Sequence, residues 1–129
     1  MVKQVIVTIF NVLFANLLVL VFFNNHDMIL NFVSCFIASA ATIIGSIYIV
    51  SNIGSKYSFW GNFFVSLRAI IAVVIISTCL IILSLSIYKG TFLIKDLYGS
   101  VFFGLFSAVV LIVPEVIIAL LNATVLNAD

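Results

Sequence analysis

The stretch FFGLFSAVVLIVPEVIIALLNA, residues 102–123, decides how the rest of this chain is interpreted. It is long enough to cross a bilayer as an α-helix, which takes about 20 predominantly apolar residues. Within it, a proline is followed by a carboxylate, Pro114 and Glu115. A charged side chain at that depth costs about 3 kcal/mol by insertion scales, so Glu115 needs a partner, a proton or a water-filled cavity.

The composition of the whole chain is that of an integral membrane protein. Hydrophobic residues make up 66% of the sequence and charged residues 7%, whereas about a quarter of the residues in soluble domains are charged. The net charge of +1 and the lack of a basic stripe argue against nucleic acid as a partner. The sequence has no nucleotide-binding motif, metal-binding cluster or nucleophile–base pair, so we expect no enzymatic activity, no catalytic residues, no metal and no cofactor.

Four apolar runs divide the chain, and each is close to the length that a bilayer demands. The connectors between them are short, which favours antiparallel neighbours. We therefore predict a single all-α membrane domain over residues 1–129, with four transmembrane helices in an up-down-up-down bundle. The predicted spans cover residues 4–23, 28–50, 60–87 and 98–122.

Small side chains recur at regular steps in the second and fourth runs. In lipid, helices associate where small residues let their backbones approach. Pro114 lacks a backbone donor and is predicted to kink the fourth helix. The residues predicted to pack the helices together are Ser34, Ala38 and Gly45 in the second run, and Gly104 and Ala108 in the fourth.

Polar residues of all four runs are predicted to lie at one depth. Arg68 follows Trp60 by eight residues and Glu115 precedes Asn122 by seven, which places both charges about 10–12 Å from the same membrane face. We expect them to form a buried ion pair, which suits helix packing or docking better than it suits ion transport. The predicted polar layer consists of Asn11, Thr42, Ser46, Arg68 and Glu115.

The third run contains Asn62-Phe63-Phe64-Val65-Ser66-Leu67-Arg68-Ala69-Ile70, with a basic residue early in the helix, and the fourth run contains a proline. In these features the chain resembles the ATP synthase protein I family, which are small four-span proteins of the bacterial inner membrane that help to assemble the rotor ring. Val65 and Ser66 stand where an acidic residue is expected before the cation. The resemblance implies a multi-pass protein of the bacterial inner (cytoplasmic) membrane.

These features predict a small non-enzymatic accessory or assembly protein that acts on a partner inside the bilayer, because few residues remain outside the spans. The expected partners are the lipid bilayer and either another membrane protein or a second copy of the chain. Two alternatives stay open. One is a small oligomeric ion or solute channel or transporter, and the other is a membrane immunity protein.

Overall fold

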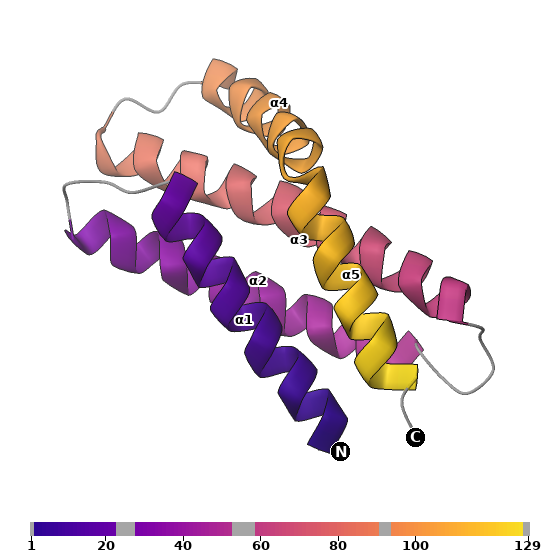
Figure 1. Cartoon of the computed structure of the whole chain (residues 1–129). Helices are drawn as coiled ribbons and strands as arrows, with labels where there is room; N and C mark the ends of the chain where they lie inside the picture. The colour runs from indigo at the N-terminus through magenta and orange to yellow at the C-terminus, as the bar shows by residue number, and fades with distance from the viewer. Residues whose placement is uncertain (1, 23–27, 53–58, 91–93, 128–129) are drawn as a thin grey trace.

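The computed structural model of the chain consists of five α-helices (Figure 1). It describes residues 2–22, 28–52, 59–90 and 94–127. This described part contains no strand, so the predicted all-α fold class is confirmed. The helices are α1 (Val2–Phe22), α2 (Met28–Asn52), α3 (Phe59–Tyr88), α4 (Ile94–Val110) and α5 (Ile112–Asn127).

The longest helix, α3, lies at the centre of the arrangement. It packs against α2, α4 and α5, while α1 packs on α2 and also touches α5. In Figure 1, α4 and α5 follow one another along α3 and run in the opposite chain direction. Two apolar clusters hold these contacts: Val19, Ala38 and Ile81 between α1, α2 and α3, and Phe63, Ala119 and Ala123 between α3 and α5.

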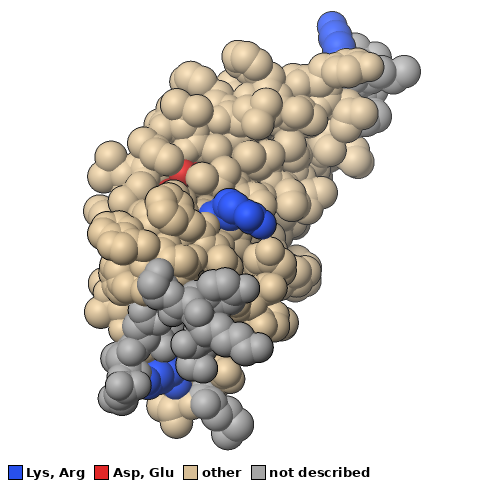
Figure 2. Space-filling model, turned by 90° about the vertical axis from the view of Figure 1, so that its right-hand side faces the viewer, with Lys and Arg blue, Asp and Glu red and all other residues tan. Residues whose placement is uncertain are grey.

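Polar side chains share the interior of the protein with apolar ones, and the surface is largely apolar, unlike that of a soluble protein. Asn62, Ser66 and Glu115 are almost completely buried, whereas large apolar side chains such as Phe32 and Phe102 remain exposed. Figure 2 shows a face covered almost entirely by uncharged residues, with few charged groups among them. Lipid tails solvate such a surface as well as another apolar side chain would. This distribution indicates a membrane protein.

Three helices are long and apolar enough to cross a membrane on their own, and they span Val2–Val21, Met28–Asn52 and Phe59–Tyr88. The predicted spans 4–23, 28–50 and 60–87 agree with α1, α2 and α3 to within two residues at each end. The fourth predicted span, 98–122, is not one helix. Lys95–Val110 and Ile112–Val125 are bent by 66° relative to one another, and they make a fourth span only if they are taken together.

The bend between α4 and α5 has its cause in Pro114. This residue has no N–H group to donate to the Val110 carbonyl one turn earlier, and its ring crowds that carbonyl. The bonds on either side are intact, since the Leu111 N–H donates to Ser107 O at 2.9 Å and the Glu115 N–H donates to Leu111 O at 3.0 Å. The kink predicted at Pro114 is therefore a helix break that redirects the chain.

The small residues that were predicted to pack the helices lie buried on α2 and α4. A β-carbon added at Gly104 would lie 2.9 Å from the backbone oxygen of Ile75 on α3, so these two helices approach closely. A β-carbon at Gly45 would lie 2.5 Å from Cγ2 of Val73, also on α3. Atoms of α3 therefore leave no space for a side chain at either glycine. The other predicted packing residues, Ser34, Ala38 and Ala108, are buried as well.

Substituting Gly45 by alanine is expected to loosen the α2–α3 contact and to lower the free energy of unfolding by about 1–3 kcal/mol. Val73 is β-branched and has one strongly preferred rotamer in a helix, so its methyl group does not swing aside readily. Thermal unfolding in detergent micelles measures the loss. Combining Gly45→Ala with Val73→Ala removes the clashing methyl group and should restore most of the stability; a double variant as unstable as Gly45→Ala would show that another contact is responsible.

Candidate functional site

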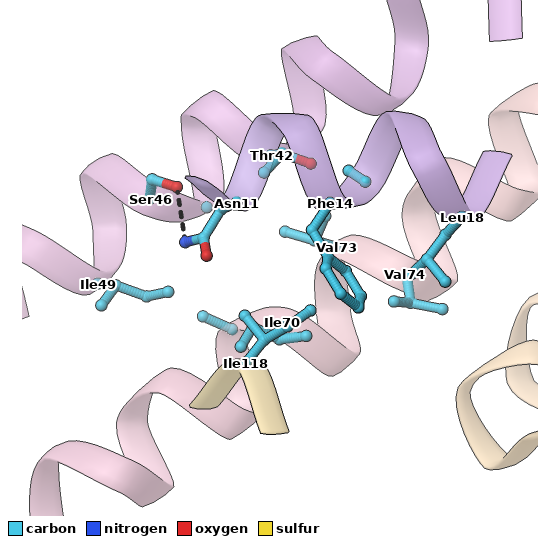
Figure 3. A pocket seen from close by; sticks show the side chains of 13 residues that line it. Asn11, Phe14, Leu18, Thr42, Ser46, Ile49, Ile70, Val73, Val74 and Ile118 are labelled. Atoms are coloured by element: carbon cyan, nitrogen blue, oxygen red, sulfur yellow. Dashed lines mark hydrogen bonds between the residues drawn. The ribbon is translucent and has the colours of Figure 1, made fainter. Parts of the chain in front are cut away.

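Four of the five residues predicted to form the polar layer are buried, and two of them touch. Nδ2 of Asn11 on α1 donates a hydrogen bond to Oγ of Ser46 on α2, with an N···O distance of 3.3 Å (Figure 3). Thr42 lies one turn from Ser46 and donates to Ala38 O within its own helix, at 2.6 Å. Glu115 on α5 is only 1% exposed. The layer is therefore joined between α1 and α2 by a direct contact.

A cavity of about 60 Å³ lies beside this contact, and four helices meet around it (Figure 3). Its lining is mostly apolar and includes Asn11 of α1, Ser46 of α2, Ile70 of α3 and Ile118 of α5. Oδ1 of Asn11 is buried and has no hydrogen-bond partner. A water molecule needs about 10–15 Å³ and polar partners, so the cavity has room for water at its Asn11 side. Glu115 lies one turn before Ile118 on the same buried face of α5.

Arg68 does not join this layer, and the predicted ion pair with Glu115 is wrong. Arg68 is exposed, and neither carboxylate oxygen of Glu115 has a hydrogen-bond partner. The reason is direction around the helix. Arg68 follows the buried Ser66 by two residues, which is about 200° of helical turn, so the two side chains leave α3 on nearly opposite sides. Spacing along the chain predicts depth but not this direction.

Arg68 instead lines an open groove of about 590 Å³ between α2 and α3. The groove is otherwise lined by apolar side chains and Tyr48, and it includes the small residues Ala40 and Ala72. Arg68 stands about 13 Å from the start of α3, within the apolar length of the helix. A guanidinium stays charged in proteins, and an opposite charge nearby offsets the cost of placing it at this depth.

Three further polar residues, Asn62, Ser66 and Asn122, are buried with Glu115 and were not predicted. Asn62 and Ser66 lie one turn apart on the buried side of α3, and Asn122 lies two turns after Glu115 on the buried side of α5. Oγ of Ser66 and Nδ2 of Asn122 have no hydrogen-bond partner. The four-residue and seven-residue spacings of these pairs are the sequence signal that identifies the shared face.

The geometry defines the class of the protein: a helical membrane protein with several buried polar residues, an unpartnered buried carboxyl group and an exposed arginine in a largely apolar groove. Among the described residues, no group of three or more His, Cys, Asp or Glu side chains is placed to hold a metal ion. Comparison of the chain with protein families, with curated proteins and with solved structures gives no match.

Proposed function

We propose that the protein is a small non-enzymatic accessory or assembly protein of the bacterial inner membrane, and that it docks on a partner within the bilayer. In this proposal α1, α2, α3 and the bent pair α4–α5 form four spans in up-down-up-down order. The observation that supports docking is the exposed Arg68 in the apolar groove between α2 and α3.

A partner helix that carries a carboxylate would neutralise Arg68 and cover the apolar side chains of this groove. An arginine within the apolar length of a spanning helix costs about 3 kcal/mol by insertion scales, and an opposite charge offsets that cost. Ala40 and Ala72 line the same groove, and small residues allow a second helix to approach closely. Along α2 the lining extends from Phe36 to Tyr48, about 18 Å or three helical turns. This length suits a helix segment.

A second copy of the chain does not offer the required charge from its described residues. Their acidic side chains are Asp96, in the first turn of α4, and Glu115, which is buried. The proposed partner is therefore a different membrane protein with an acidic residue in an apolar helix. The resemblance of the segment around Arg68 to the ATP synthase protein I family agrees with an assembly role of this kind.

Site-specific photocrosslinking in native membranes tests the docking proposal. A photoreactive residue at Ile44, which is exposed in the groove, is expected to capture one integral membrane protein. The same residue at Phe106, on the exposed side of α4, is the control and should not capture it. Arg68→Gln removes the charge and Ala72→Leu fills the groove. Each is expected to reduce capture at Ile44 at least tenfold. Truncating one partner of a buried charge pair costs about 2–5 kcal/mol, and the leucine side chain takes the space that the partner helix needs.

The identity of the captured protein decides the result. A partner whose spanning helix has an acidic residue, and whose acidic-to-basic substitution restores capture by an Arg68→Glu chain, supports the proposal. A partner without such a residue, a second copy of the chain, or lipid alone contradicts it.

A further inference from the structure

The polar atoms that remain without hydrogen bonds inside the bundle are mainly oxygens. They include both carboxylate oxygens of Glu115, Oδ1 of Asn11 and Oγ of Ser66. One nitrogen, Nδ2 of Asn122, also lacks a partner. Native proteins leave few buried polar groups unsatisfied, and each one calls for an explanation such as an ion or a water molecule. The oxygens of Glu115 and Asn11 can only accept while the carboxyl group is ionised, so a ligand that donates a proton or carries positive charge would satisfy them.

Three of these residues come from different helices but lie in the same region. Phe63 of α3 and Ala119 of α5 belong to one apolar cluster. Because α3 and α5 run in opposite directions (Figure 1), Ser66 and Glu115, each about one turn from that cluster, lie on the same side of it. Asn11 of α1 lines a cavity together with Ile70 of α3 and Ile118 of α5, which lie one turn along their helices from Ser66 and Glu115.

No cation in the described part of the chain meets Glu115. Arg68 lines the groove between α2 and α3, and Lys3 lies about 12 Å from Asn11 along α1. Helix α2 has no charged residue at all. The titratable groups without charge on the helices packed here are Cys35 and Tyr48 on α2, Cys79 and Tyr88 on α3, and Tyr98 on α4, and Tyr48 lines the same groove as Arg68. The remaining charged groups, Lys89, Lys95 and Asp96, lie between the end of α3 and the first turn of α4.

From this arrangement we infer that Glu115, together with Ser66 and Asn11, binds a single positive charge inside the bundle, carried by a proton or by a small monovalent metal ion such as Na⁺. A proton converts one carboxylate oxygen into a hydroxyl group that donates to Ser66 or Asn11. A metal ion instead accepts lone pairs from carboxylate, amide and hydroxyl oxygens, which are hard ligands suited to such ions. Either one removes the cost of burying an isolated charge.

Infrared difference spectroscopy of the full chain in liposomes tests this site, because a protonated carboxyl group and a carboxylate absorb at different frequencies. Subtracting the spectrum of Glu115→Gln isolates the signal of Glu115. In buffer without Na⁺, the protonated band is expected at low pH and should be lost as the pH rises. If Na⁺ converts this band to the carboxylate band at constant pH, whereas choline at the same concentration does not, the site takes the metal ion. If the protonated band is lost only when the pH rises, and Na⁺ has no effect on it, the site binds a proton.

Two spectra would overturn the inference. A carboxylate band at every pH and Na⁺ concentration means that another group already neutralises Glu115, and a protonated band that responds to neither means that the acid binds nothing exchangeable. Because both readings come from inside the bundle, they leave the docking proposal for the groove untouched.

The substitution Ser66→Ala tests whether the hydroxyl group of Ser66 contributes to binding at this site. Removing its hydroxyl group is expected to weaken binding about tenfold, which appears as a titration midpoint about one pH unit lower or a Na⁺ midpoint about tenfold higher. Ser77→Ala is the matched control, since Ser77 is buried on the same helix but donates to Val73 O at 2.6 Å. Equal midpoints in the two variants would exclude Ser66 from the site. Circular dichroism checks that each variant keeps its helices.

Discussion

Replacing Ala119 by leucine is expected to be the most damaging substitution in α5. Ala119 is completely buried between α3 and α5, where it belongs to one cluster with Phe63 and Ala123. The larger side chain has no space unless the two helices separate, and overpacking of this kind costs about 1–3 kcal/mol, or more where backbone must move. We expect a lower unfolding temperature in detergent micelles and less protein accumulating in the membrane.

The matched control for Ala119→Leu is Ala72→Leu. It adds the same atoms to an exposed position on α3, so the unfolding temperature should stay close to that of the parent chain. Equal unfolding temperatures for the two variants would mean that α3 and α5 are not closely packed at Ala119.

Replacing Gly104 by alanine is the second substitution for which we expect a large loss of stability. The new methyl group would lie 2.9 Å from Ile75 O and 3.0 Å from Cys79 Sγ, both on α3. A backbone oxygen does not move without its helix, so α4 must shift away from α3. The hydrogen bond from Cys79 Sγ to Ser100 O, now 3.3 Å long, joins the same two helices and should weaken with that shift. We expect an unfolding free energy lower by about 1–3 kcal/mol.

Gly99→Ala is the control within the same helix, and it is expected to change the unfolding free energy in the opposite direction or not at all. Nothing lies within 4 Å of a β-carbon built at Gly99, and alanine favours a helix over glycine by about 1 kcal/mol. This variant should therefore be as stable as the parent chain or slightly more stable. If Gly104→Ala behaves like Gly99→Ala in thermal unfolding, α3 and α4 do not approach each other as closely as described.

The depth of polar residues in the bundle could be predicted from sequence spacing, but their direction could not. Counting residues from the helix ends placed Asn11 level with Thr42 and Ser46 one turn nearer the membrane face, and the side chain that Asn11 contacts is that of Ser46. The same counting paired Arg68 with Glu115, which fails because Arg68 leaves α3 on the side of α2. Direction depends on which face of α3 packs against α5. The buried pair Asn62 and Ser66 marks that face, and its four-residue spacing is a sequence signal that counting depth alone does not use.

The apolar composition was enough to locate three helices, because a run of apolar residues and its polar flanks determine where a membrane-spanning helix begins and ends. It was not enough for the fourth run. Pro114 signals a weakened point, since one backbone hydrogen bond is lost there. The size of the resulting bend depends on how the segments on either side pack against α3, and that packing involves residues far apart in the sequence, such as Gly104 and Ala119.

The 66° bend also sets the end-to-end length of the pair α4–α5. The 30 residues of α3 make a rod about 45 Å long. The 17 residues of α4 and 16 of α5 would reach about 50 Å if they were collinear, but at the observed angle their far ends lie about 42 Å apart. Pro114 thus brings the end-to-end length of α4–α5 close to the length of α3. In the proposed four-span arrangement, the bent pair therefore suits a bilayer of about the same thickness as α3 does, because a difference in length between neighbouring spans has to be taken up by tilt or by deformation of the lipid.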